Sequence, residues 1–272
     1  MAGTLYLVAT PIGNLEDITL RALRVLREAD LIACEDTRHT RKLLDHYGIS
    51  KPTVSYHEHN EAARAAELIA RLVAGTSIAL VCDAGTPLLS DPGYRVVTAA
   101  IEAGVAVVPI PGPSAALGAL TASGLATASF RFCGFLPPKS GARRKALEQF
   151  QHDACALIFY EAPHRILDAL ADVQAVFGSR FVVVARELTK LHEEFLRGTA
   201  AAVREQLAKR DAIKGEFTLL IDKAPEVVED TTPVDEAVRA LEQQGVPRMD
   251  AIKQVARARG LSKRDVYREV LE

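Results

Sequence analysis

Cysteine is scarce in this sequence, which has only four among 272 residues. The four stand far apart, and most lie inside apolar runs, a spacing that fits neither a disulfide framework nor a structural zinc site. The pattern is typical of reduced thiols in a cytosol, so we expect a cytoplasmic protein. The cysteines are Cys34, Cys82, Cys133 and Cys155.

Long hydrophobic runs and an excess of one charge are also lacking. No apolar run approaches the about 20 residues that span a bilayer, and the N-terminus leads straight into a short strand-like run. We therefore expect neither a membrane span nor a signal peptide. The net charge is −2, so the chain is not a polycation, and any contact with nucleic acid must come from local basic patches.

Several common motifs of binding and catalysis are missing as well. No G-x-G-x-x-G follows the first predicted strand, which leaves a dinucleotide site poorly supported, and no Walker A loop is found. No G-x-S-x-G marks a serine nucleophile elbow. His57 and His59 stand two residues apart, but no convincing third ligand lies nearby, so we predict no metal site.

What the first half does contain is a regular alternation of short apolar runs and helical patterns. Strands alternating with helices of this length predict a mainly parallel sheet with helices on its faces. The expected strands are residues 4–9, 30–34, 53–56, 77–82 and 105–108.

Three polar residues stand where helices are expected to begin. Thr19 precedes a helix whose apolar face we expect to be Leu20, Leu23 and Leu26. By the same reasoning, Asn60 and Ser114 are predicted to cap two later helices.

After Gly124 the pattern restarts with a second set of strands. Some connections here are too short for a crossover helix, so we expect an α/β half with more antiparallel pairing. Residues 136–145 are interpreted as a basic loop. The expected strands are residues 129–135, 155–160, 180–185, 195–198 and 216–222, with helices up to about 176 and over 200–208.

Residues 223–232 are interpreted as a linker, rich in charge and proline, before a small helical tail. Three short helices are expected, and Ser262 with Asp265 forms a capping box for the third. Residues 248–268 hold seven Lys or Arg against two Asp. This pattern favours a helix-turn-helix-like module that contacts nucleic acid, while a small capping bundle with solvated charges is the alternative.

Each predicted strand ends in a loop of small, polar and acidic residues, and the central one lies within residues 80–94. Open α/β sheets bind ligands at the carboxyl ends of their strands. Glycine lets a ligand approach the backbone, and proline fixes the shape of a loop. The pattern predicts an α/β enzyme that holds a folded polar cofactor between two sheets. The loops are TPIGN, CEDTR, CDAGTP, PIPGPSA, FYEAP, RELT and KGE.

In their order along the chain, these loops and their flanks resemble the bacterial small-subunit ribosomal RNA methyltransferase I family, of the tetrapyrrole methylase superfamily. The resemblance covers about residues 4–222, and LSKRDVYREVL resembles that family's C-terminal helical module. Cys82 departs from the family, which usually has serine before Asp83, but this small-for-small change should leave the loop intact. The matching segments are LYLVATPIGNLEDIT, CEDTRHT, SYHEHNE, CDAGTPLLSDPGY, VPIPGPSA, GFLPPK, FYEAPHR, RELTKLHEE and KGEF.

The resemblance implies a fold and a reaction. Two α/β domains, residues 1–123 and 124–223, would hold S-adenosylmethionine between them, followed by a helical tail over residues 231–272. The chain would form a homodimer and methylate a cytidine 2′-hydroxyl in the decoding region of small-subunit ribosomal RNA, as free RNA or in the 30S subunit. Matching positions for cofactor contacts are Pro11, Gly13, Asp83, Ala84, Gly85, Thr86, Pro87, Ser114, Ala115, Glu161, Leu188 and Gly215.

Methyl transfer to a ribose hydroxyl requires that the oxygen be oriented and that its proton find an acceptor. Acids at strand ends are candidates for this acceptor, and basic residues are candidates for RNA phosphate contacts. The candidate acids are Glu35, Asp36, Glu58 and Glu161. The candidate RNA contacts are Arg38, Lys139, Arg143, Arg144, Arg165, Arg186, Lys190, Lys263 and Arg264.

Two other functions remain open from the sequence. A methyltransferase for a tetrapyrrole is one, although the basic tail and the basic loop at 139–145 argue against it. A non-catalytic RNA-binding or ribosome-assembly factor is the other, although the intact CDAGTP and PGPSA loops argue against that.

Overall fold

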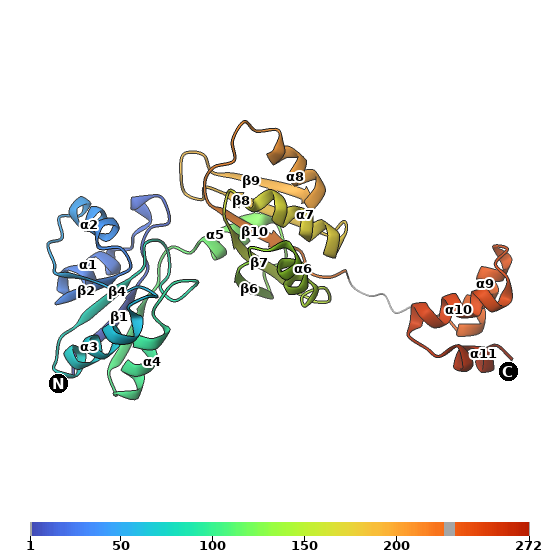
Figure 1. The fold of residues 1–272 in the computed structure, drawn as a ribbon, viewed down its shortest axis with the longest axis horizontal. Coiled ribbons are helices and arrows are strands. Elements are labelled where there is room, and N and C mark those ends of the chain that lie inside the picture. The colour runs from blue at the N-terminus through green and yellow to red at the C-terminus, as the bar shows by residue number, and fades with distance from the viewer. Residues whose placement is uncertain (1, 226–231, 272) are drawn as a thin grey trace. The chain divides into compact units, whose positions relative to one another are not determined.

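The computed structural model describes residues 2–225 and 232–271. The chain forms two compact units (Figure 1), which we call the α/β unit, residues 1–224, and the C-terminal unit, residues 225–272. The α/β unit contains two five-stranded sheets. Of the predicted linker at 223–232, residues 226–231 lie outside the described residues.

The first sheet has the strand order β3-β2-β4-β1-β5, and all its pairings are parallel. The prediction of a parallel sheet is therefore confirmed. Strands β2 and β4 are buried along their whole length, as expected for strands covered by helices on both faces. The strands are β1 Thr4–Val8, β2 Leu31–Cys34, β3 Thr53–Ser55, β4 Ile78–Val81 and β5 Ala106–Ile110.

Helices cover both faces of this sheet. Apolar residues of α1 and α2 form a core with one face, and those of α3 and α4 form a core with the other. A single 3-10 turn, η1 Leu15–Asp17, follows β1. The helices are α1 Leu20–Glu28, α2 Thr37–His46, α3 Glu61–Val73 and α4 Tyr94–Glu102.

The predicted helix caps are confirmed in two of three places. Thr19 accepts a hydrogen bond from the backbone of Ala22, and Ser114 caps α5 Ala115–Ser123 in the same way. Asn60 stands before α3 but makes no capping bond. Its side-chain oxygen instead accepts from the backbone N–H of His57 at 2.9 Å, because the chain turns back on itself there.

The expected apolar face of α1 is wrong at one position. Leu23 and Leu26 are buried, but Leu20 is 87% exposed. As the first residue of α1, Leu20 lies off the face that contacts the sheet, where Ala22 and Val25 pack instead.

The second sheet has the order β6-β7-β10-β8-β9. Only β6 and β7 pair in parallel, and the other pairings are antiparallel, as predicted. The last strand in the sequence, β10, lies at the centre of the sheet. The strands are β6 Phe130–Phe135, β7 Ala156–Glu161, β8 Phe181–Arg186, β9 Glu194–Thr199 and β10 Phe217–Ile221.

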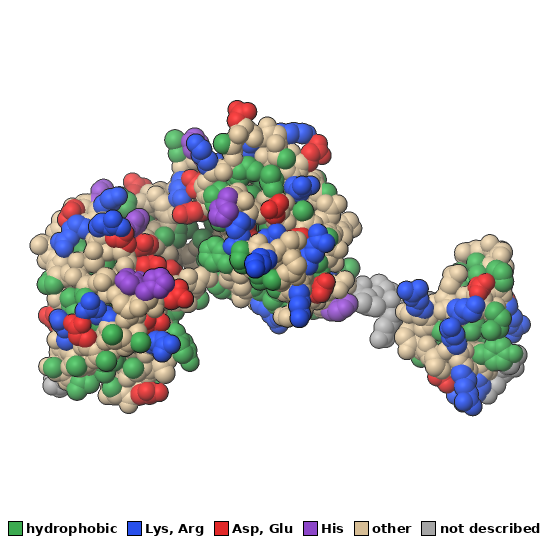
Figure 2. All heavy atoms as spheres, viewed as in Figure 1, with side chains coloured by type: hydrophobic (Ala, Val, Ile, Leu, Met, Phe, Trp, Pro, Cys, Tyr) green, Lys and Arg blue, Asp and Glu red, His purple; other side chains and the backbone are tan. Residues whose placement is uncertain are grey.

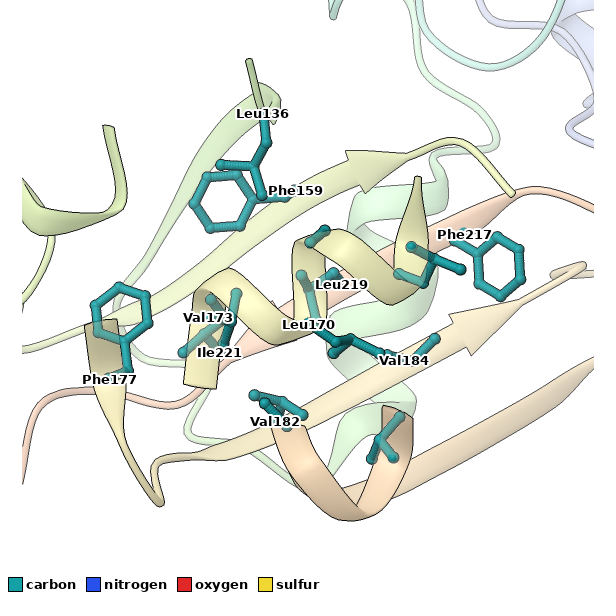
Figure 3. Close-up of a cluster of buried hydrophobic side chains, with 14 of the residues drawn as sticks. Leu136, Phe159, Leu170, Val173, Phe177, Val182, Val184, Phe217, Leu219 and Ile221 are labelled. Carbon is teal, nitrogen blue, oxygen red and sulfur yellow. The ribbon is translucent and has the colours of Figure 1, made fainter. Parts of the chain in front are cut away.

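Three helices pack on one face of the second sheet, namely α6 Ser140–Glu148, α7 Ile166–Phe177 and α8 Ala200–Ala208. Figure 3 shows Leu170 and Val173 of α7 lying against the side chains of β8 and β10. Helix α6 corrects the expectation of a loop at 136–145. Its core contacts are few, chiefly Leu147 and the buried Arg143, so no apolar period shows in the sequence.

Helix α5 covers the opposite face of the second sheet. Ala116, Ala119 and Leu120 of α5 pack with residues of β7, β8 and β10. By its packing, this helix belongs with the second sheet, although the expected boundary placed it at the end of the first domain. The domain limits themselves remain predictions.

The C-terminal unit is a three-helix module with its own small core. Its helices are α9 Val234–Gln243, α10 Arg248–Arg259 and α11 Lys263–Leu271. Val238, Ile252 and Val266 are buried between them. The Ser262 hydroxyl accepts a hydrogen bond from the backbone N–H of Asp265, which is the first half of the predicted capping box. In place of the second half, the hydroxyl itself donates to the Asp265 carboxylate.

Candidate functional site

Two neighbouring cavities open where the strand ends of the two sheets meet within the α/β unit. We call the one of about 400 Å³ the main cavity and the one of about 330 Å³ the side cavity. Both lie in the size range of small-molecule sites, and they share Ile12, Asp83, Ala84 and Glu216. The first sheet contributes the loops after β1, β4 and β5 to the main cavity, and the second contributes the ends of β6 and β7 and the start of β10.

The loop after β4, residues 82–93, is tied to the loops on either side of it. Thr10 and Gly85 exchange backbone hydrogen bonds of 2.8 and 3.0 Å. The Thr10 hydroxyl donates to the Cys82 carbonyl at 3.1 Å, and that of Thr86 donates to the Pro113 carbonyl at 3.1 Å. The three loops therefore form one wall of the main cavity.

The backbone of the same loop adopts an unfavourable conformation in two places. Leu88 has φ 73° and Ser90 has φ 68°, values that side-chain-bearing residues rarely adopt. Each costs on the order of 1–3 kcal/mol, and such residues gather at functional sites. Leu89, Ser90 and Asp91, which lie in or directly after this stretch, all line the main cavity.

Acids dominate the polar lining of the main cavity. Asp83, Asp91, Glu161 and Glu216 line it, whereas the described residues that form its wall include no Lys, Arg or His. A negative, partly enclosed cavity favours a cationic ligand over an anionic one.

Glu161 is fixed in place by its neighbours. It is 2% exposed and lies 3.0 Å from the Arg165 guanidinium, while its carboxylate accepts from the backbone of Ala162 at 2.9 Å. Burial raises the pKa of Glu161 against the opposing effects of these partners. With its oxygens engaged in this way, Glu161 is better suited to shape the wall than to accept a proton.

The other three predicted proton acceptors differ widely in their surroundings. Burial and the Asp83 carboxylate raise the pKa of Glu35, but Glu35 lines neither cavity. Asp36 caps α2 and pairs with Arg38 at 2.7 Å, and these bonds hold its pKa well below the usual range. Glu58 is exposed and lines neither cavity. The geometry therefore argues against Asp36 and Glu58.

The predicted cofactor residues mostly surround the two cavities. Pro87, Leu188 and Gly215 line neither of them, and Leu188 packs instead against the core beneath α5. Those that line one cavity or both are Pro11, Gly13, Asp83, Ala84, Gly85, Thr86, Ser114, Ala115 and Glu161.

The side cavity is closed in part by contacts between loops of the two sheets. Lys190 packs so closely on Gly13 that a Cβ there would lie 2.5 Å from the lysine Cγ. The backbone N–H of Asn14 donates to the Thr189 hydroxyl at 3.1 Å. These contacts hold the loop after β8 against the loop after β1.

Among the predicted RNA contacts, Arg143 needs correction. It is 2% exposed and pairs with the buried carboxylate of Asp172 at 2.7 Å. It also donates to the Pro137 and Pro138 carbonyls. Since its guanidinium holds the fold together internally, we withdraw Arg143 from the proposed phosphate contacts.

The remaining basic residues fall into two groups. Arg165, Arg186 and Lys190 are less than a third exposed and engaged in ion pairs with acids of the second sheet and its loops. The second group is exposed, although Arg38 pairs with Asp36 and Arg144 with Asp172. It comprises Arg38, Lys139, Arg144, Lys263 and Arg264. Figure 2 shows Lys and Arg side chains spread over the visible face of the C-terminal unit.

Sequence reasoning gave no role to several residues of the main cavity. Asp91 stands inside the segment that carried the resemblance, where an acid before Pro92 and Gly93 was the available signal. Tyr160, Phe217 and Thr218 line the cavity from the second sheet. Tyr160 and Phe217 fall within the segments FYEAPHR and KGEF but were given no role, and no local pattern marks Thr218.

Two further kinds of site are not found in the described part of the chain. Residues 2–225 and 232–271 contain no group of three His, Cys, Asp or Glu able to hold a metal ion. No helix in those ranges is both long and apolar enough to cross a membrane.

Known proteins share the fold of this chain. The family model of the tetrapyrrole (corrin/porphyrin) methylases matches residues 4–204. The uroporphyrin-III-C-methyltransferase structure from Thermus thermophilus has a TM-score of 0.58 at 23% identity, and the match covers 81% of this chain and 94% of that one. A diphthine synthase structure has a TM-score of 0.60 at 18% identity, and that match covers 81% and 90%. These likenesses establish the fold.

Relatives of higher identity carry a more specific name. A protein of Halalkalibacterium halodurans named Ribosomal RNA small subunit methyltransferase I is 52% identical over 272 residues, covering 97% of this chain and 93% of that one. A Haemophilus influenzae protein of the same name is 48% identical, covering 98% and 96%. The chain therefore belongs to the ribosomal RNA small subunit methyltransferase I family, within the tetrapyrrole methylases.

Proposed function

We propose that this chain transfers a methyl group from S-adenosylmethionine to the 2′-hydroxyl of a cytidine in the decoding region of small-subunit ribosomal RNA. Membership of the family supports an S-adenosylmethionine-dependent methyltransferase, and the shared name of its relatives supports ribosomal RNA as the substrate. The observation that carries the proposal is the acidic main cavity walled by the predicted cofactor loops.

The residues of the main cavity fit this donor. S-Adenosylmethionine supplies a methyl group on a positively charged sulfur, which leaves as a neutral thioether. The carboxylates of Asp83 and Glu216 complement its positive charges, and Ile12 and Leu89 offer apolar contact for a purine ring. Asp83, Gly85 and Ser114 are the residues of the first sheet that we propose to hold it.

The chain's own contribution to the reaction is orientation and proton removal. A hydroxyl attacks rapidly only when it is held in line with the bond that breaks, about 3 Å from the methyl carbon. Hydrogen bonds through Thr10, Gly85 and Thr86 hold the three loops together. Ligand binding therefore loses little free energy to the ordering of these loops.

Contact with RNA phosphates is proposed for exposed cations outside the cavity. Lys139 is the N-cap of α6, Arg144 lies in the middle of that helix, and Arg38 lies at the start of α2. Lys263 and Arg264 add charge on α11 of the C-terminal unit. Because the cavity itself is acidic, these cations would hold the backbone while one ribose enters.

Methyl transfer with labelled S-adenosylmethionine tests the proposal. The purified chain is incubated with small ribosomal subunits, with protein-free small-subunit RNA, and with a uroporphyrin-type tetrapyrrole. We expect label in the RNA of one or both ribosomal substrates, and 2′-O-methylcytidine among its digested nucleosides. Label in the tetrapyrrole alone, or in no substrate, contradicts the proposal, and label on a base contradicts its 2′-hydroxyl part.

The proposal includes a homodimer in the cytoplasm. The homodimer is carried over from the resemblance, and light scattering of the purified chain tests it. The cytoplasmic location is consistent with four free cysteines among the described residues, and cell fractionation tests it.

A further inference from the structure

Asp91 lies on the wall of the main cavity, at the end of a loop that is fixed from both sides. Before it, the backbone is left-handed at Leu88 and Ser90. After it, the carboxylate of Glu61 accepts from the backbone N–H of Gly93 at 3.2 Å. The carboxyl group of Asp91 therefore has a defined position beside the proposed cofactor residues Asp83 and Ser114.

The groups that face Asp91 are acids and weak donors. The thiol of Cys82, which donates to the backbone carbonyls of Ala84 and Gly85, and the carboxylates of Glu35 and Asp83 all lie near enough to affect its pKa. From the second sheet, Tyr160 of β7 lies close enough for the charge of Asp91 to act on it. Among the described residues, none of the ion pairs involves Asp91.

Among the described residues, Asp91 has neither an ion pair nor a hydrogen bond from the backbone, which distinguishes it from the other acids of the cavity. Glu161 pairs with Arg165, and Glu216 pairs with Lys190 at 3.0 Å. Asp83 accepts from the backbone N–H of Asp36 at 3.1 Å, which fixes the start of α2. Asp91 therefore combines a place on the cavity wall with a carboxylate that no cation neutralises.

The surroundings of Asp91 also give its carboxyl group a pKa that suits a general base near neutral pH. Burial, followed by the charge of Glu35, raises the pKa of Asp91 to about 6. A general base works best when its pKa lies near the working pH, because it is then both ionised and basic.

We propose that Asp91 accepts the proton of the attacking ribose hydroxyl, an inference that rests on the proposed function. The ribose oxygen forms its bond to the methyl carbon while its O–H bond breaks and the proton passes to the Asp91 carboxylate. The electron pair of the old carbon–sulfur bond stays on sulfur. The positive charge of the donor and the negative charge of Asp91 are both cancelled, and the proton later leaves to water.

Asp91→Asn, which keeps the shape of the side chain, tests this role. We expect unchanged S-adenosylhomocysteine affinity, within about threefold, by calorimetry. We expect kcat for methylation of small ribosomal subunits to fall about 10²- to 10⁴-fold, the usual size of a general-base effect. In the unaltered chain, kcat/KM should fall below about pH 6, and this acid limb should disappear in the variant. Asp45→Asn, at an exposed aspartate that lines neither cavity, serves as the matched control.

A measurement without turnover keeps the inference testable if the variant folds poorly. Carbon-13 NMR of labelled aspartate carboxyls in the unaltered chain should show one group that titrates near pH 6, and that signal should be missing from Asp91→Asn or from Asp91→Glu. A titration of Asp91 near pH 4 would overturn the role.

The remaining outcomes separate the role of Asp91 from the function itself. Transfer by Asp91→Asn at near-normal kcat, or with the acid limb intact, overturns the role alone. Lost S-adenosylhomocysteine binding makes Asp91 a cofactor ligand and overturns the role as well. No transfer to RNA by the unaltered chain overturns the proposed function, and the role of Asp91 with it.

Discussion

The carboxylate of Glu61 accepts a hydrogen bond from the backbone N–H of Gly93, 32 residues further along the chain. The same oxygen accepts from the Tyr56 hydroxyl at 2.9 Å and from the backbone N–H of Arg95 at 3.3 Å. One side chain at the start of α3 therefore joins the end of β3 to the start of α4, and it holds the far side of the loop that carries Asp91.

Replacing Glu61 by alanine should destabilise the fold. The two backbone N–H groups and the Tyr56 hydroxyl would lose their acceptor, at a cost of about 1–3 kcal/mol. Urea unfolding measures this loss. Glu67→Ala is the control, because Glu67 lies on the same helix and pairs with Arg64 and Arg71 near the protein surface. We expect this variant to lose less than about 1 kcal/mol of unfolding free energy. Equal losses in both variants would show that the Glu61 contacts contribute little.

Gly85→Val should weaken cofactor binding. Gly85 has φ 85°, and a Cβ there would lie 3.3 Å from Ile12 and toward the main cavity wall. We expect S-adenosylhomocysteine affinity to fall at least about tenfold, since each 1.4 kcal/mol of lost binding is one factor of ten. Gly104→Val is the control, because Gly104 has φ 69° with open space around it, so it carries a similar backbone strain far from either cavity. Asp83→Ala should weaken binding in the same way. Unchanged affinity in both loop variants would remove residues 83–87 from the site.

Acid should unfold the chain partly through Glu194. Hydrogen bonds from Arg210, with a smaller contribution from Arg186, lower the pKa of Glu194 to about 2. A carboxylate with a lowered folded-state pKa contributes stability above its unfolded pKa, near 4.5, and that contribution is lost as the pH falls toward 2. We expect Glu194→Gln to lose about 1–3 kcal/mol at pH 7 and to show a shallower decline in stability between about pH 5 and 2.

Urea unfolding at a series of pH values checks the Glu194 effect. Glu205→Gln is the matched control, because Glu205 pairs with Lys209 at a side chain that is 71% exposed. The loss of unfolding free energy in Glu205→Gln should be small at every pH. A Glu194→Gln variant that follows the same pH curve as the unaltered chain would contradict the prediction.

Removing residues 225–272 should separate RNA binding from cofactor binding. The C-terminal unit has its own core around Val238 and Val266, and the α/β unit is compact without it. We expect the shortened chain to keep its melting temperature within about 2 °C and its affinity for S-adenosylhomocysteine. Affinity for small ribosomal subunits should fall at least about tenfold and become less dependent on salt, because fewer phosphates are neutralised. Equal losses of both affinities would mean that the C-terminal unit is structural.

The strands and loops that surround the site could be predicted from the sequence more fully than the side-chain contacts within it. Apolar runs such as Ile78–Val81 are buried on both faces, so their strand character shows in the sequence without knowledge of their neighbours. Parallel strands place their carboxyl ends along one edge, which is why the loops after β1, β4 and β5 could be expected to meet.

What could not be predicted depends on contacts between distant residues. Arg143 looks like a surface cation in the sequence, and only the position of Asp172 on α7 shows that it is buried. Helix α6 lacks an apolar period because a buried ion pair replaces part of its core contact. Asp91 was visible as an acid in a turn, but its lack of a cationic partner depends on which side chains fold around it.

The position of β10 has a consequence for how the chain is made. This strand is the last of the α/β unit to leave the ribosome, yet it lies between β7 and β8 and, with Glu216 just before it, supplies Phe217 and Thr218 to the main cavity. A nascent chain that ends before residue 217 can assemble the first sheet but has a gap in the middle of the second. The proposed methyl-donor site is therefore completed only after residue 218 has been made and has left the ribosome.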